Sequence, residues 1–380
     1  MHCQTTTHTT PSGWSQPLPR HLDGAQTLVL AFGASDLVDA PQPLAELAAA
    51  FPNSVVMGCS TSGEIAGPFV QDQSISVAVA QFEHTRLKRA CTTIDNAADS
   101  HAAGARLAAQ LNGEGLRSVF ILSDGMHVNG TPLVAGLAEG LPPGVQITGG
   151  LAGDGSRFAR TWVLGDPEPK AQQLCAVGFY GERLRVGHGC VGGWLDFGPE
   201  RRITKAEGNV LYELDGKPAL QLYKTYLGDM AKDLPGAALL FPLAVRRSAG
   251  DGESVVRTIL GIDEATQSMT FAGDMPQGGI ARLMRATNDQ LIDSAGQAGR
   301  AALGMIQADS PALVVSVSCV GRRLVLGQRT DEEVEIVLED APAGSAHVGF
   351  YSYGEISPSV AGGACELHNQ TMTVTVFSES

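Results

Sequence analysis

The sequence predicts a mixed α/β protein of two domains, each with helices packed on a mixed, largely antiparallel sheet. Short apolar runs that fit strands alternate with segments in which apolar residues recur at helical spacing. Glycine is abundant, at 46 of 380 residues, which indicates many turns and close backbone approaches. The phrase GCSTSGEI at 58–65 returns as GFYSYGEI at 349–356, once in each half, although two short copies do not establish a duplication.

In the first half, strands are expected where apolar residues run together or alternate with polar ones. These strands lie at 27–33, 54–58, 75–79, 118–124, 160–164, 174–180 and 184–190. Helices are expected between them at 44–51, 102–111 and 131–141. The glycine-rich stretch ITGGLAGDGSRF at 147–158 is typical of a strand that ends in turns.

A bend rich in glycine and proline at 192–204 predicts a domain boundary. The predicted division is a disordered lead-in at 1–24, an N-terminal domain at 25–200 and a C-terminal domain at 201–380. The lead-in is expected to be disordered because MHCQTTTHTTPSGWSQPLPR is polar and has no apolar core.

Beyond the bend, a turn and helix are expected at 214–228, and strands at 238–245, 254–262 and 311–320. Thr287 with Gln290, and Thr330 with Glu333, have the spacing of capping boxes, so each pair predicts the start of a helix. The chain ends in two strand patterns, AHVGFYSYGEI and TMTVTVF. The second alternates apolar residues with threonines, which predicts a strand with one exposed face.

Charge, hydropathy and cysteine usage restrict the binding partners and the cellular compartment that are expected. A formal net charge of −14 disfavours nucleic acid or an anionic membrane surface as a partner. No apolar run is long enough to span a bilayer, and the N-terminus lacks the pattern of a signal peptide. The seven cysteines are scattered without a CxxC pair, which predicts reduced thiols in a cytoplasm.

The known catalytic and metal motifs do not occur. GCSTSG lacks the G-x-S-x-G spacing of a nucleophile elbow, and GGLAGDG lacks the spacing of a dinucleotide or phosphate loop. Cys59 as a nucleophile with His127 as its base stays open, although a buried structural thiol is the favoured interpretation. No catalytic residue is therefore assigned. The histidines form no zinc or covalent-haem motif, but a single histidine can hold a non-covalent haem.

Two groups of polar residues are candidate ligand-binding sites. Asp124, His127 and Asn129 follow a strong strand, where α/β proteins place ligand contacts, although a solvated loop residue is the favoured interpretation of each one singly. The second group lies in GFYSYGEISPSV and CELHNQTMTVT, and should gather if these two strands pair. Its members are Tyr351, Tyr353, Glu355, His368 and Asn369. They suit either a small polar ligand or a buried polar network that fixes the strand pair.

At this cluster the sequence resembles the FIST family of bacterial and eukaryotic sensory proteins, over roughly residues 25–375. The resemblance is carried by GCSTSGEI, ITGGLAGDG, LYELDGKPALQLYKTYLG, VSCVGRRLVLG, GFYSYGEISP and ELHNQTMTVTVFSE. It implies an N-terminal and a C-terminal FIST domain, a role in intracellular signal transduction and the sensing of a small ligand. The NosP subgroup has this two-domain layout, binds haem and senses nitric oxide.

The resemblance thus predicts haem b as cofactor and a histidine kinase or cyclic-di-GMP enzyme as partner, and it allows a homo-oligomer. His188, in the apolar stretch RVGHGCVGGW, is the preferred axial ligand, with His127, His347 and His368 as alternatives. An ordinary strand histidine remains the simpler interpretation of His188. The alternative function is a binding protein or enzyme for a small polar metabolite, such as an amino acid, at the cluster around Glu355 and His368.

Overall fold

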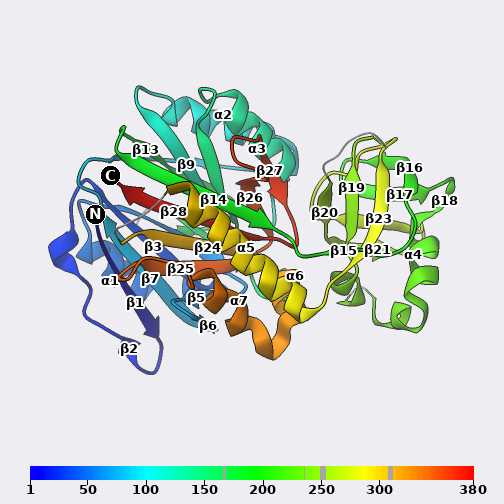
Figure 1. The fold of residues 1–380 in the computed structure, drawn as a ribbon, viewed down its shortest axis with the longest axis horizontal. Coiled ribbons are helices and arrows are strands. Elements are labelled where there is room, and N and C mark those ends of the chain that lie inside the picture. Colours follow the sequence, from blue (N-terminus) through cyan, green and yellow to red (C-terminus); the bar gives the residue numbers. More distant parts are fainter. Residues whose placement is uncertain (166–167, 235, 249–253, 307–310) are drawn as a thin grey trace.

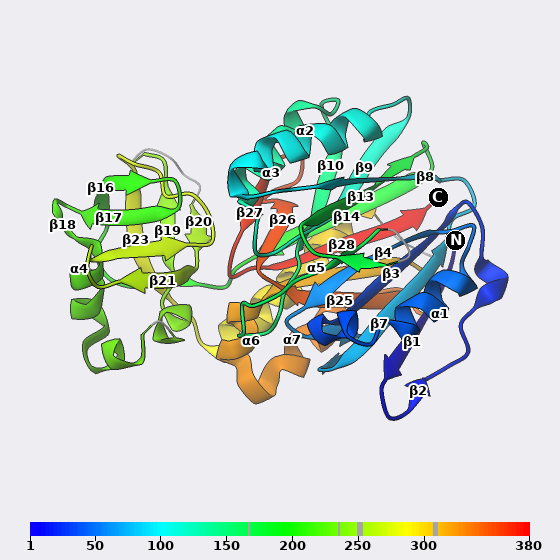
Figure 2. The ribbon, with the colours of Figure 1, turned by 180° about the vertical axis from the view of Figure 1, so that it is seen from behind.

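The chain forms a large body from both ends of the sequence, and a small domain beside it (Figures 1 and 2). This computed structural model describes residues 1–165, 168–234, 236–248, 254–306 and 311–380. The chain leaves the large body after Val191 and returns to it at Asn288. The two passages are adjacent in Figure 1, so the small domain is an insertion into the large body.

Three sheets make up the large body. The first has the order β12 (Pro169–Lys170), β11 (Val163–Leu164), β4 (Val55–Thr61), β3 (Thr27–Ala34), β7 (Ser74–Gln81), β1 (His2–Thr9), β2 (Gly13–Trp14). The second has the order β27 (Cys365–His368), β26 (Gly354–Pro358), β10 (Gln146–Leu151), β9 (Leu116–Ser123), β13 (Gln173–Tyr180), β8 (Arg86–Thr93). The third has the order β14 (Leu184–Val191), β28 (Met372–Glu379), β24 (Leu313–Cys319), β25 (Ala346–Ser352), β5 (Glu64–Ala66), β6 (Phe69–Gln71).

The three sheets follow one plan. At the centre of each lies a parallel pair, β3 with β4, β9 with β10, or β24 with β25, joined through a helical connection. Each unit then sends a hairpin into another sheet: β5–β6 joins the third, β11–β12 the first and β26–β27 the second. An antiparallel strand, β7, β13 or β28, returns to pair with β3, β9 or β24. The large body is therefore a threefold repeat, and its third unit carries the inserted small domain.

One glycine marks the same position in each unit. A Cβ atom there would lie 1.9 Å from a carbonyl oxygen of the parallel neighbour, so only glycine fits. The pairs of glycine and neighbour are Gly58 and Ala31, Gly149 and Ile121, and Gly349 and Ser316. GCSTSGEI, GGLAGDG and GFYSYGEI thus open three equivalent turns, two of which the sequence pattern reveals.

Backbone hydrogen bonds close these turns into a ring. The bonds are Ser62 N to Tyr351 O (2.7 Å), Tyr353 N to Leu151 O (3.2 Å) and Gly153 N to Ser60 O (2.9 Å). Each bond joins one unit to the next, so the three units are linked at the carboxyl ends of their parallel strands. In α/β proteins, this end of a sheet is where ligand contacts are commonly found.

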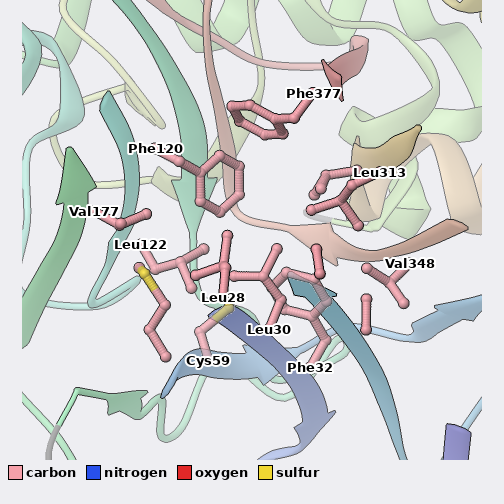
Figure 3. Close-up of a cluster of buried hydrophobic side chains, with 14 of the residues drawn as sticks. Leu28, Leu30, Phe32, Cys59, Phe120, Leu122, Val177, Leu313, Val348 and Phe377 are labelled. Atoms are coloured by element: carbon pink, nitrogen blue, oxygen red, sulfur yellow. The ribbon is translucent and has the colours of Figure 1, made fainter. Parts of the chain in front are cut away.

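The core lies between the inner faces of the three sheets. Figure 3 shows side chains such as Leu28, Phe120 and Leu313 meeting there, one from each sheet. Helices cover the outer faces, so most of the central strands are buried on both sides. The α-helices of the large body are α1 (Gln42–Ala50), α2 (Ser100–Leu111), α3 (Gly130–Glu139), α5 (Asn288–Ile306), α6 (Val320–Leu326) and α7 (Thr330–Val337).

The small domain has its own core around Leu211, Tyr223 and Phe271. Its elements are β15 (Leu195–Asp196), β16 (Arg201–Glu207), β17 (Val210–Leu214), β18 (Lys217–Pro218), α4 (Ala219–Leu227), β19 (Leu243–Arg246), β20 (Val255–Arg257), β21 (Ile259–Asp263), β22 (Ser268–Phe271) and β23 (Ile280–Arg285). The 3-10 helices of the chain are η1 (Arg20–Leu22), η2 (Ser35–Val38), η3 (Ala97–Asp99), η4 (Gly228–Asp233), η5 (Gly236–Leu240) and η6 (Gly327–Arg329).

The mixed α/β class with largely antiparallel sheets is confirmed, but the layout corrects several expectations. The lead-in at 1–24 is not disordered, because His2–Thr9 pair with β7 along their whole length. The bend at 192–204 does lead into a separate domain. However, the segment 201–380 is divided between the small domain and the third unit, because β28 pairs with β14 of the first half.

The expectation of reduced thiols is wrong for one pair. Cys91 and Cys175 face each other across β8 and β13 and form a disulfide. They are 84 residues apart in sequence, so only the strand register reveals the pairing. Cys3, Cys59, Cys190, Cys319 and Cys365 are free.

Three local predictions also fail. Residues 238–245 begin in η5 and become a strand only at Leu243. The threonines of the last strand are buried, because that face packs toward the central core. Thr330 and Glu333 form no capping box, since Thr330 bonds to Gly327 and Glu333 pairs with Arg322. Among the described residues, no helix has the length and apolar character needed to cross a membrane.

Candidate functional site

Glu355 is fully buried behind the turn that opens the third hairpin. Its carboxylate accepts hydrogen bonds from Ser352 Oγ (2.6 Å), Thr371 N (3.2 Å) and Thr371 Oγ1 (2.9 Å). Burial raises the pKa of Glu355 to about 8 despite these bonds. The carboxyl group thus fixes the turn, and at neutral pH it is mostly protonated and therefore uncharged.

His368 lies directly opposite Glu355 in the antiparallel pair of β27 and β26, so both side chains are on one face. Its Nε2 bonds to the carbonyl oxygen of Ser357 (2.9 Å), and burial lowers the pKa of His368 to about 4. The next residue, Asn369, is fully buried, and neither atom of its amide finds a partner among the described residues. Buried amides are normally paired, so Asn369 is an exception that indicates a missing polar partner.

The two tyrosines of this cluster point to different layers, because the chain passes from the third sheet to the second between them. Tyr351 Oη donates to Glu333 Oε2 (2.6 Å), which also belongs to the buried ion pair with Arg322. Tyr353 Oη donates to Gly155 O (3.0 Å), and its ring stacks on Phe158. The structure therefore places Glu355 opposite His368, with Asn369 next in the chain, and places both phenols in other networks.

Asp124 and Asn129 are both engaged in bonds within the protein. The Asp124 carboxylate accepts from the backbone of Met126, His127 and Gln172 and from Thr161 Oγ1, which fixes the loop after β9. Asn129 caps α3 through Thr131 N, and its Nδ2 donates to Asp274 Oδ1 of the small domain (2.8 Å). Asn129 thus lies at the junction between the large body and the small domain.

The pairing of Cys59 with His127 does not occur. Cys59 is buried in the central core, and burial raises the pKa of its thiol well above the ordinary value. His127 is half-exposed and bonds to Asp124 through Nδ1 (3.1 Å). A thiol without an adjacent base and without a lowered pKa is not an activated nucleophile.

Of the four histidines considered for haem, His188 has the freest imidazole. His347 uses both ring nitrogens, toward Ser316 Oγ (2.8 Å) and Gly67 O (2.8 Å). His188 is 3% exposed, and its Nε2 has no partner among the described residues. Burial lowers the pKa of His188, so the imidazole is neutral, as metal coordination requires.

His188 lines a cavity of about 550 Å³ between β14, the end of α3 and the loop after β26. The lining is mainly apolar, with residues such as Leu141, Pro142, Ile147 and Pro358. A neutral imidazole beside an apolar slot is the chemistry that holds a haem. The described lining residues include no lysine or arginine, so haem propionates would have to face solvent.

A second cavity, of about 590 Å³, lies beside the GCSTSGEI turn. Glu64 lines it, and burial raises the pKa of that carboxyl to about 7. Around it, Arg323 pairs with Asp72 (2.7 Å) and Arg157 pairs with Asp154 (2.6 Å), so the charges of this cavity are largely satisfied within the protein. The predictions missed this site, although GRR directly after the strand at 311–320 was a signal for charged groups there.

A third cavity, of about 520 Å³, lies between the small domain and the large body. It is lined from the small domain by residues that include Arg257 and Asp274, and from the large body by Thr131, Glu366 and others. The sequence analysis also missed this cavity, although an arginine within the apolar run SVVRTILGI was a visible anomaly. Among the described residues, no group of three or more metal-ligating side chains is present.

Comparison with known proteins identifies two family domains along the chain. A profile of the FIST N domain matches residues 27–217, and a profile of the FIST C domain matches residues 219–358. An uncharacterised protein of Mycobacterium tuberculosis (strain CDC 1551 / Oshkosh) is 27% identical over 248 residues, which cover 62% of this chain and 61% of the relative.

Another uncharacterised protein, of Mycobacterium bovis, is 26% identical over 250 residues, covering 62% of this chain and 61% of the relative. One from Methanocaldococcus jannaschii is 36% identical over 92 residues, or 23% of this chain and 17% of the relative. The chain thus spans about three fifths of the length of the mycobacterial relatives it matches. Because the two FIST profiles together cover most of its length, the chain belongs to the FIST family of sensory, signal-transduction domains.

Proposed function

We propose that this protein is a haem-based nitric oxide sensor that acts on a separate signalling enzyme. The observation that carries the proposal is the unpaired Nε2 of His188 beside an apolar cavity of about 550 Å³. FIST domains are sensory domains, so a small-ligand site is expected in the chain. When bound, haem iron supplies an open coordination position for a diatomic gas.

The position of His188 suits a sensor. It lies near the end of β14, and the small domain begins with β15 only a few residues further on. A change in the bond between the haem iron and His188 would therefore act close to the segment that connects β14 to the small domain. A ligand shifts such an equilibrium only when it binds the two arrangements with different affinity.

A signalling partner is proposed because FIST domains are sensory domains of signal-transduction proteins. We propose a histidine kinase or a cyclic-di-GMP enzyme, in the cytoplasm, as that partner. The small domain exposes Leu195, Met230 and Leu260, which could contribute to a contact surface.

The proposal is tested by titrating the apo-protein with haemin and recording the Soret band. Wild-type protein should bind one equivalent of haemin. In His188→Ala the Soret band should no longer lie at the wavelength of an imidazole-ligated haem. Ala138→Trp, at an exposed position of the cavity wall, should block uptake without unfolding the protein. His84→Ala, on the surface, serves as the matched control and should behave as wild type. Absence of a Soret shift with folded wild-type protein rejects the proposal.

A second candidate function is the binding or conversion of a small polar metabolite beside Glu355 and His368. The observation that favours it is the unpaired amide of buried Asn369. A thermal-shift screen of amino acids against wild-type protein and Asn369→Ala tests this idea. Stabilisation of the wild type that the variant loses would support it, and no stabilisation by any amino acid would reject it.

A further inference from the structure

The cavity between the small domain and the large body contains an arginine without a counter-ion. Arg257, at the end of β20, is 5% exposed. Its Nε donates to the carbonyl oxygen of Asp274 (3.3 Å) and its Nη1 to that of Leu367 (3.0 Å). Among the described residues, these two bonds to backbone carbonyls are the hydrogen bonds of the guanidinium, and no carboxylate forms an ion pair with it.

Two carboxylates, Asp274 and Glu366, lie near Arg257, but neither forms an ion pair with it. Asp274 directs its Oδ1 to Asn129 rather than to Arg257, and Glu366 lines the cavity without bonding to the guanidinium. Burial lowers the pKa of Arg257 to about 10, and the neighbouring carboxylates only partly oppose this effect. Buried charges in proteins are normally paired, because an isolated buried charge carries a large desolvation cost. An unpaired buried guanidinium therefore indicates a partner that comes from outside the chain.

The surroundings of Arg257 are shaped for a ligand. Arg246 and Arg247 also line the cavity. Thr131 of the large body is a further lining residue, and its Oγ1 is buried without a partner among the described residues. Behind the guanidinium lies Gly273, where a Cβ atom would come within 2.8 Å of Arg257 Nε. The volume of about 520 Å³ is that of a small-molecule site and exceeds what a single ion needs.

We propose that this cleft binds a small metabolite through an oxyanion, a carboxylate or a phosphate, held by Arg257 and by the hydroxyl of Thr131. A guanidinium is suited to both groups, since its planar N–H donors match either pair of oxygens. The ligand would contact the small domain through Arg257 and the large body through Thr131. It would therefore fix the small domain relative to the large body, which is a means of signalling that does not require haem.

The cleft also adjoins the cavity of His188. Ala364, in the loop before β27, and Cys365, the first residue of β27, line both cavities. Occupation of the cleft would thus constrain one wall of the His188 cavity. Because anion binding is measured on the apo-protein, its outcome is independent of the haem proposal.

The test is the melting temperature of the apo-protein in sodium phosphate, succinate or citrate, each matched in ionic strength with sodium chloride. At least one oxyanion should raise Tm saturably above the chloride control. Carboxylates acting alone identify a carboxylate ligand, and phosphate acting alone a phosphorylated one. Equal Tm values in all salts would overturn the proposal.

Variants locate the site. Arg257→Gln should weaken the effective anion at least tenfold, and Thr131→Val should weaken it without disturbing Arg257. Glu366→Gln, which removes a repelling carboxylate from the lining, should tighten binding. Arg202→Gln, an exposed arginine on β16, is the control and should bind as wild type. If Arg257→Gln fails to fold, Thr131→Val and Glu366→Gln still test the site. Unchanged affinity of both variants for the effective anion would overturn the proposal.

Discussion

The turns at GCSTSGEI and GFYSYGEI are equivalent positions in two units of one threefold body, yet they have different surroundings. In each, a glutamate binds the hydroxyl three residues before it and the first residues of a returning strand. Glu64 bonds to Thr61 and Ser74, and Glu355 bonds to Ser352 and Thr371. The shared bonds show that the glutamate belongs to the scaffold of the turn.

The two turns differ in the residues that surround these glutamate contacts. Asp72 and Asn369 occupy equivalent positions, each before a glutamine with positive φ. Asp72 pairs with Arg323 and borders an open cavity, whereas Asn369 is fully buried with an unpaired amide. Gln370 also donates to Leu239 O of the small domain (3.2 Å), so that domain covers the second turn. The comparison teaches that the repeat supplies the framework, and the insertion and individual substitutions supply distinct sites.

The largest effect should come from the three equivalent glycines. Gly58→Ala, Gly149→Ala and Gly349→Ala would each place a methyl group against a backbone carbonyl, so each should lose about 3 kcal/mol or more of unfolding free energy. Denaturant unfolding measures this loss. Gly304→Ala, in α5 with open space around it, is the control and should gain up to about 1 kcal/mol. A variant with wild-type stability at any of the three positions would contradict their structural equivalence.

Exchanging the residues that differ should have unequal effects. Asn369→Asp would bury a carboxylate without an arginine and should cost about 2 kcal/mol or more. Asp72→Asn removes only a partly exposed ion pair and should cost about 0–1 kcal/mol, less at high salt. Thermal unfolding at two salt concentrations measures both. Similar costs would contradict the different burial of the two positions.

Truncating the glutamates compares the two turns directly. Glu355→Ala leaves Ser352 and Thr371 unpaired in a closed site and should cost about 1–3 kcal/mol. Glu64→Ala should cost less, because water from the adjacent cavity can replace the carboxylate. Equilibrium unfolding of both variants provides the measurement. A larger cost at Glu64 would show that the open cavity does not admit water to this turn.

The pH dependence of stability should differ between the two glutamates. Burial raises the folded-state pKa to about 7 for Glu64 and about 8 for Glu355, above the unfolded value near 4.5. The folded state then binds the proton more tightly, so this contribution is complete below the unfolded pKa and is lost as pH rises through the folded pKa, by at most about 1.4 kcal/mol per pH unit.

Replacement by glutamine removes this loss. Glu64→Gln should gain stability relative to wild type up to about pH 7, and Glu355→Gln up to about pH 8. Urea unfolding from pH 4 to pH 9 distinguishes the two windows. Parallel curves for wild type and Glu355→Gln would contradict the raised pKa.

Local patterns predicted many elements well. The apolar run at 311–320 forms β24, and the capping box of Thr287 and Gln290 precedes α5, with both reciprocal hydrogen bonds present. Such features depend on neighbours in sequence, so one chain is enough to recognise them. By contrast, the lead-in at 1–24 has the composition of a disordered segment, but a sheet edge on β7 pairs with it.

The candidate site was harder to predict, because it depends on register and on contacts distant in sequence. The opposition of Glu355 and His368 followed from assuming that their strands pair, and that pairing is present. The free Nε2 of His188 and the unpaired guanidinium of Arg257 could not be recognised, since hydrogen-bond partners are fixed only by the folded backbone. The third copy of the turn was missed because GGLAGDG retains only the glycine of the shared position.

The absorption spectrum of the full protein purified from haem-replete cells tests the proposed sensor most directly. The account predicts a Soret band in the purified protein, its displacement on addition of nitric oxide, and its loss in His188→Ala while His84→Ala keeps it. A folded, colourless wild-type protein that also fails to take up added haemin would contradict the account.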